Sequence, residues 1–276
     1  MLFKNYNHQE AYMLDIKSLI RVPVFLVLAA FSLAAQADHS WNGYHWARTT
    51  THFTLPVVDS VTTDWDGQLS ESLARWSLSS VLAANVTSAS DSTKTRKQCR
   101  MVQGQMRVCN AAYGFNGWLG LATISLDPNG HIDRGTAKVN DSYSSYWTYE
   151  EKNHVMCQEI GHVLGLGHTS EDGSSQQTCM DYSSDPLSQW PNQHDYDELV
   201  AIYGHTDSYN SYNDGSGSGG GACTAPPGKG CNNNGVDVPP MGVRVVRGPH
   251  HEIWVAPRSD GGLWIHHIRL APKELR

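Results

Sequence analysis

The feature that most constrains this 276-residue chain is a segment that reads QEIGHVLGLGH from Gln158 to His168. Gln158 and His162 are one helical turn apart, so a helix through them places both side chains on one face. Glu159 lies beside them, within reach of a water bound to a metal ion. The glycine three residues after His162 permits a sharp turn, which lets His168 return toward the same point. Two imidazoles, one further ligand and a neighbouring carboxylate are typical of an open catalytic zinc site.

The pattern resembles the signature of the metzincin zinc metalloproteases, H-E-x-x-H-x-x-G-x-x-H followed by a Met-turn. Met180, within the segment CMDY, matches the Met-turn. The resemblance covers most of residues 41–204 and is nearest the matrixin branch. It implies an α+β, zincin-like domain with a twisted, mixed five-stranded sheet, three helices and a cleft between an upper and a smaller lower subdomain. The implied cofactor is Zn2+.

One position departs from the family pattern, because Gln158 stands where the first zinc-binding histidine is expected. An amide oxygen is a weaker zinc ligand than an imidazole. His154 is an unsuitable replacement, since it precedes His162 by two turns, roughly 12 Å along a helix that rises ~1.5 Å per residue. Cys157 is also unsuitable, because it lies about 140° around the helix from His162. The metal ligands predicted from the sequence are therefore Gln158, His162 and His168.

The resemblance also implies catalytic roles for two residues. Glu159 is the expected general base, which takes a proton from the metal-activated water and then delivers it to the leaving amine. Tyr182 has the spacing from Met180 at which astacins and serralysins place a tyrosine that stabilises the oxyanion. A tyrosine that only packs in the core is the alternative. The expected activity is hydrolysis of protein or peptide substrates by a zinc endopeptidase.

Gln158 keeps a second function class open. A catalytically weakened or inactive secreted protein, derived from such a protease and used for binding or as a scaffold, has the same fold and motif. Retention of Glu159 favours the enzyme, because a binding protein has no chemical need for that carboxylate.

The six cysteines favour disulfides over thiolate–zinc sites, provided that the chain is exported. Local spacing favours two short-range pairs. In the family fold the Met-turn lies directly beneath the metal-binding helix, which favours a third pair. The predicted disulfides are Cys99–Cys109, Cys223–Cys231 and Cys157–Cys179.

The first residues of the chain predict export. Residues 22–35 are apolar, follow Lys17 and Arg21, and run into the A-x-A pattern of a signal cleavage site. The apolar run is shorter than the ~20 residues that span a bilayer, although an uncleaved anchor is the alternative. Met13 is an alternative start. The chain is therefore expected to be secreted, periplasmic or extracellular, with no stable membrane insertion once the signal has been removed.

Composition divides the chain into four segments. These are a secretory signal (1–37), a metzincin-like domain (38–205), a linker rich in Gly, Ser and Asn (206–240) and a β-hairpin or β-meander tail (241–276). Within the domain, strands are expected at 53–61, 118–126 and 131–140, helices at 64–84, 146–166 and 194–203, and a hairpin at 98–109.

The tail lies outside the resemblance, and its alternating pattern leaves its role open among binding a partner, positioning a substrate and completing the sheet of the domain. Its four histidines, at positions 250, 251, 266 and 267, are expected on solvated strand faces rather than at a second metal site. A net charge of −7 argues against a general nucleic-acid binder, and a monomer is expected.

Overall fold

The computed structural model describes residues 39–215 and 239–276, and these described residues belong to one compact unit. The expected signal segment 1–37 and the predicted Cys223–Cys231 pair lie outside the described residues. None of the helices within the described ranges combines the length and the hydrophobicity of a membrane span.

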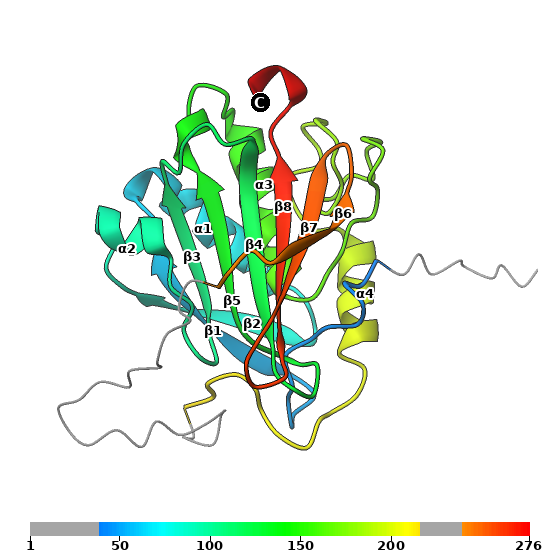
Figure 1. The fold of residues 1–276 in the computed structure, drawn as a ribbon. Coiled ribbons are helices and arrows are strands. Elements are labelled where there is room, and N and C mark those ends of the chain that lie inside the picture. The colour runs from blue at the N-terminus through cyan, green and yellow to red at the C-terminus, as the bar shows by residue number, and fades with distance from the viewer. Residues whose placement is uncertain (1–38, 216–238) are drawn as a thin grey trace, which may run out of the picture. The chain divides into compact units, whose positions relative to one another are not determined.

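A single mixed sheet organises the described residues (Figure 1). Its eight strands run in the order β2-β1-β3-β5-β4-β8-β7-β6. β1 pairs in parallel with β2 and β3, and β3 pairs in parallel with β5, whereas the remaining pairs are antiparallel. The strands are β1 (Phe53–Ser60), β2 (Leu82–Ser88), β3 (Met106–Ala111), β4 (Trp118–Leu126), β5 (Ile132–Asn140), β6 (Val243–Arg247), β7 (His251–Pro257) and β8 (Leu263–Leu270).

The tail completes this sheet. β8 pairs antiparallel with β4 along nearly its whole length, and β7 and β6 follow on the outer side. The expectation of a five-stranded sheet is therefore corrected, since the tail adds three strands to the five that precede it, and of the roles left open for the tail it is completion of the sheet that the structure shows. Alternating hydrophobicity predicts which side chains share a face of a strand, but it does not predict the strand's partner.

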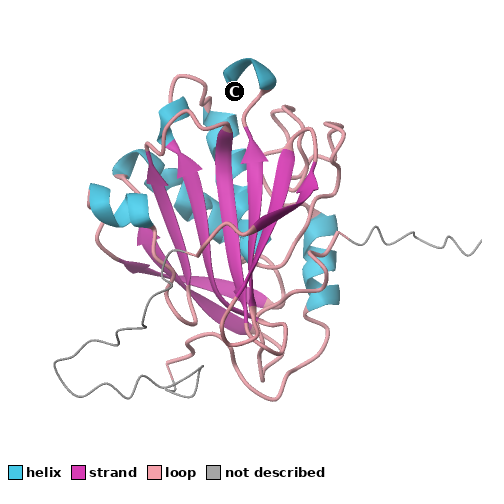
Figure 2. Ribbon diagram, in the orientation of Figure 1, coloured by secondary structure: helices cyan, strands magenta, loops and turns pink. Residues whose placement is uncertain are grey.

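The helices are α1 (Thr63–Trp76), α2 (Thr93–Gln98), α3 (Tyr149–Val163) and α4 (Gln193–Ile202), with 3-10 turns at Asp141–Tyr143 and Lys273–Leu275. α3 packs against β4, β5 and α1, so the long helices α1 and α3 cover one face of the sheet (Figure 2). The helix expected over 64–84 ends at Trp76 and β2 follows, because a serine-rich turn interrupts the helical pattern. The hairpin expected at 98–109 is the end of α2 followed by β3.

Two of the predicted disulfides are present, Cys99–Cys109 and Cys157–Cys179. The second joins α3 to the loop that leads to Met180. Replacing both Cys157 and Cys179 with serine is expected to lower the free energy of unfolding by about 3 kcal/mol, because it frees a loop of 22 residues in the unfolded chain. Urea unfolding of the oxidised proteins measures this loss. The difference should vanish when both proteins are reduced, and equal stability of the oxidised proteins would contradict the prediction.

Lys138 gives the sheet a pH-dependent stability. It lies on β5 between Cys109 of β3 and Leu121 of β4, and burial lowers the pKa of its ammonium from 10.5 to about 8. Between these two pH values the unfolded chain binds more protons than the folded chain, so stability rises with pH. Lys138→Met is expected to raise the free energy of unfolding at pH 7 by about 2 kcal/mol. Urea unfolding at pH 7 and at about pH 10 checks that this gain shrinks at the higher pH, and an equal gain at both would contradict it.

Candidate metal centre

α3 carries the core of the site, and the sequence explains both of its ends. The Thr148 hydroxyl accepts the Glu151 amide, and the Glu151 carboxylate accepts the Thr148 amide, which together form a capping box. The helix ends at Val163, and Gly165 then adopts a φ of +102°. A Cβ at Gly165 would lie 2.1 Å from the carbonyl oxygen of Tyr44, so only glycine fits this turn.

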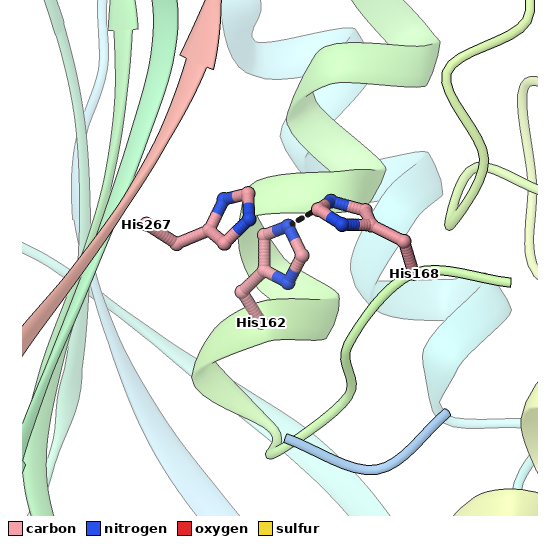
Figure 3. Close-up of side chains that lie close together, drawn as sticks. All are labelled: His162, His168 and His267. Carbon is pink, nitrogen blue, oxygen red and sulfur yellow. Dashed lines mark hydrogen bonds between the residues drawn. The ribbon is translucent and has the colours of Figure 1, made fainter. Parts of the chain in front are cut away.

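Three imidazoles from separate segments converge after this turn (Figure 3). His162 comes from α3, His168 from the following loop and His267 from β8. The Nε2 atoms of His162 and His168 are 3.1 Å apart. The ring centroid of His267 lies 3.9 Å from that of His162 and 4.5 Å from that of His168. Two nitrogens bound to one tetrahedral zinc ion are about 3.3 Å apart, so the distance between His162 and His168 suits a shared ion. His267 offers a third nitrogen within 4.8 Å of the other two.

Neighbouring groups orient two of these rings. The Nδ1 atom of His162 lies 2.8 Å from the carbonyl oxygen of Leu166, which places the ring proton on Nδ1 and the Nε2 lone pair toward His168. The Glu171 carboxylate lies 3.6 Å from Nδ1 of His168 and 3.6 Å from Nε2 of His251. A carbonyl or carboxylate behind the ring is the usual support of a metal-bound histidine.

The imidazoles are held in the form that binds metals. Burial lowers the pKa of His162 to about 3 and lowers the pKa values of His168 and His267 well below the ordinary range. All three rings are therefore neutral at pH 7, as metal ligation requires. His267 is buried, and neither of its ring nitrogens has a hydrogen-bond partner. A bound cation would satisfy this buried polar ring, and the nitrogen donor set suits zinc.

Gln158 has other partners. Its Oε1 atom accepts a hydrogen bond of 2.6 Å from Nη1 of Arg269, and its Nε2 atom donates one of 2.8 Å to the carbonyl oxygen of Asp181. Arg269 and His267 are two residues apart on β8, so both side chains lie on the strand face that covers α3. The tail thus supplies Arg269, which binds the side-chain oxygen of Gln158, and His267, which is the third imidazole of the centre.

The expectation that the tail histidines lie on solvated faces is wrong for three of them. His251, His266 and His267 are at most 2% exposed. On the face opposite α3, His266 contacts the hydroxyl of Thr123 and the carbonyl oxygen of Pro240, so both faces of β8 are covered. The sequence contains one indication that a histidine from elsewhere serves as the third metal ligand. It is the absence of a histidine at position 158.

Glu159 is fully buried between α3 and β4. A Cβ at Gly120 would lie 2.2 Å from its Oε1 atom, so this glycine makes the room for the carboxylate. Neither carboxylate oxygen makes a well-formed hydrogen bond, although the backbone of Ala122 is near. Burial raises the pKa of Glu159 well above its usual range, and the charge of Arg269 opposes this rise. Glu159 also precedes His162 by three residues, which makes the two side chains neighbours on the helix.

Tyr182 borders the same centre. Its ring centroid lies 4.2 Å from that of His168, and its buried hydroxyl has no hydrogen-bond partner. Burial raises the pKa of Tyr182 well above its usual range, so the hydroxyl keeps its proton and remains a donor. A cavity of about 540 Å3 reaches Tyr182 and Arg269. The Tyr182 ring therefore packs against His168, while its hydroxyl has no partner to which it already donates a hydrogen bond.

Met180 lies against the helix just before His162. A Cβ at Gly161 would lie 2.5 Å from the Met180 sulfur, so the thioether packs directly on the helix backbone. The amide of Thr169 donates to the Met180 carbonyl oxygen at 2.9 Å. Together with the Cys157–Cys179 disulfide, these contacts fix the loop that carries Met180 to α3 and to the segment that follows His168.

Comparisons with known proteins add little to this geometry. No protein-family model matches the chain, and no curated protein matches it in sequence. Three solved chains match in structure, among them that of myroilysin, with a TM-score of 0.35 and 12% sequence identity over 61% of this chain and 99% of the myroilysin chain. Similarity at this level assigns the chain to no family, so a function has to be inferred from the site itself.

Proposed function

We propose that the chain is an exported, zinc-dependent peptidase whose metal ion is held by His162, His168 and His267. One observation carries the proposal: three neutral imidazoles converge at the end of α3, the helix that also carries the buried carboxylate of Glu159 one turn before His162. Three protein ligands and a fourth, open position are typical of catalytic rather than structural zinc. In this ligand set His267 takes the place that the sequence pattern gives to Gln158.

The residues around the centre suit peptide hydrolysis. Zinc bound there would polarise a substrate carbonyl and lower the pKa of a bound water. Glu159 accepts the water proton on a carboxylate oxygen and passes it to the leaving amine. Tyr182 donates its hydroxyl proton in a hydrogen bond to the developing oxyanion.

The cavity of about 540 Å3 provides a place for substrate side chains. Its volume is within the usual range of small-molecule and cofactor sites. Its lining includes the cations Arg269, Lys273 and Arg276 together with the acids Glu151 and Glu274. We therefore propose that this cavity binds a polar segment of a peptide substrate. The disulfides suit the oxidising compartment that export implies, and we propose that the protein acts as a monomer without nucleic acid.

A non-catalytic binding or scaffold protein is the second candidate, and burial of the centre favours it. His162 and Glu159 are fully buried, and β8 lies against the part of β4 that faces them. The cavity beside Tyr182 is one route by which a substrate would approach the metal, and movement of the tail is another.

One experiment separates these candidates. The full chain, purified with its disulfides formed, is assayed for bound zinc and for cleavage of a mixed peptide library, before and after chelation. If the protein is a peptidase, it should bind zinc that depends on His162. Its cleavage of peptides should be lost on chelation and restored by added zinc. Bound zinc without cleavage favours the scaffold protein. If the chain binds no zinc that depends on His162, both the peptidase and a zinc-binding scaffold are overturned.

A further inference from the structure

A second histidine cluster lies outside the centre described above. It consists of His45 in the N-terminal segment, His131 just before β5, and His205 and Asp207 after α4. The Nε2 atoms of His45 and His205 are 3.2 Å apart. Asp207 lies 3.6 Å from each of them, through Oδ2 to His45 and through Oδ1 to His205. The Nε2 atom of His131 lies 3.2 Å from Oδ1 of the same carboxylate.

The hydrogen bonds behind two of these rings point the ligand atoms inward. Nδ1 of His45 lies 2.8 Å from the carbonyl oxygen of Gly43, so Nδ1 carries the proton and the Nε2 lone pair faces His205. Nδ1 of His131 lies 2.8 Å from the hydroxyl oxygen of Tyr209. Tyr209 gives its own proton to Asp127, so it accepts the proton of His131 and leaves the Nε2 lone pair toward Asp207.

Two groups that accept hydrogen bonds repel each other unless a proton or a metal cation lies between them. The cluster brings Nε2 of His45 to Nε2 of His205, and Nε2 of His131 to the Asp207 carboxylate, and these are contacts that a shared metal cation would satisfy. The separations of 3.2–3.6 Å match those between ligands that share one metal ion, about 3.3 Å for tetrahedral zinc. Two imidazoles and one carboxylate form a donor set that favours zinc over calcium or magnesium.

We propose that His45, His205 and Asp207 bind a second transition-metal ion, with zinc as the physiological candidate, and that His131 lies next to this ion, with its Nε2 atom 3.2 Å from Asp207. The site is separate from the peptidase proposal and does not depend on it. It is also open to solvent, because the side chain of His205 is 54% exposed.

This second ion would join two parts of the chain that are distant in sequence, next to the turn that carries His131. His45 and His205 are 160 residues apart, and the turn that carries His131 links β4 to β5. The Asp207 carboxylate already accepts the backbone amide of Arg48 at 2.9 Å, so the ion would strengthen an existing contact between the N-terminal segment and the chain after α4.

The experiment uses the full chain carrying His162→Ala, which removes the first centre, with and without His205→Asn. His205 is the exposed member of the cluster, so its replacement leaves the core intact. His52→Asn, at an exposed histidine outside the cluster, is the matched control. Zinc is the probe, and bound metal is counted after dialysis into chelator-treated buffer.

The His162→Ala protein and its His52→Asn derivative are expected to keep one zinc ion per chain and to gain several degrees in the midpoint of thermal unfolding when zinc is added. The His205→Asn derivative is expected to lose both the ion and the gain. Absence of zinc from the His162→Ala protein, or equal zinc content with and without His205→Asn, overturns the proposal. In the first case the cluster is held by protons on its histidines instead. The zinc content of the wild-type protein is measured in parallel. It shows, independently of the second site, whether the centre that contains His162 binds zinc.

Discussion

Replacing His267 with alanine is expected to remove zinc from the centre formed with His162 and His168 and to abolish peptide cleavage. Two imidazoles remain, and neither Gln158 nor His154 is free to take the third position, because both contact Arg269. Changes in residues that only support a ligand lower metal affinity by about 10–100-fold, so loss of a ligand should exceed about 100-fold. A zinc titration against a competing chelator measures the loss.

The matched control for this variant is His266→Ala. His266 is adjacent in sequence and equally buried, but its ring lies on the opposite face of β8, where it contacts Thr123. This variant is expected to lose stability and to retain zinc. If Gln158→Ala removes the zinc while His267→Ala does not, the ligand set predicted from the sequence pattern is the correct one.

Replacing Glu159 with glutamine is expected to lower the rate of peptide cleavage by about 1000-fold while zinc content stays unchanged. Glutamine keeps the shape that fits against Gly120, but it cannot take a proton from water at neutral pH. The substitution also removes a buried carboxylate with no well-formed hydrogen bond, so stability should not fall. Measurement of kcat together with metal content separates lost chemistry from a lost ion.

Glu150→Gln is the control for this second substitution. Glu150 lies in the first turn of the same helix, away from the imidazoles, and its replacement should leave kcat unchanged. Unchanged cleavage by the Glu159→Gln protein would show that the carboxylate is not the general base, and another group would then have to take that role.

The part of the site that is local in sequence could be predicted, and the part that depends on distant pairing could not. The helix, the turn at Gly165 and the approach of His168 to His162 follow from spacing and from the conformational freedom of glycine. His267 reaches the centre only because β8 pairs with β4, about 140 residues earlier in the chain. Strand alternation carries no information about that partner.

The same limit applies to the fold. The strands at β1, β4 and β5 and the long helix α3 lie close to their expected positions, because each has a clear local pattern. The helix predicted over 64–84 overlaps the first three residues of β2, since Leu82, Ala83 and Ala84 suit a helix as well as a strand. The pairing of β2 with β1, which the local pattern does not contain, decides between the two.

The position of β8 in the sequence has a consequence for biosynthesis. His162 and His168 leave the ribosome roughly a hundred residues before His267, an interval of several seconds or more at about 5–20 residues per second. Throughout that interval the nascent chain has only two of the three imidazoles of the proposed centre. If the protein is the proposed peptidase, it would therefore stay inactive on the ribosome until β8 has been synthesised and has paired with β4.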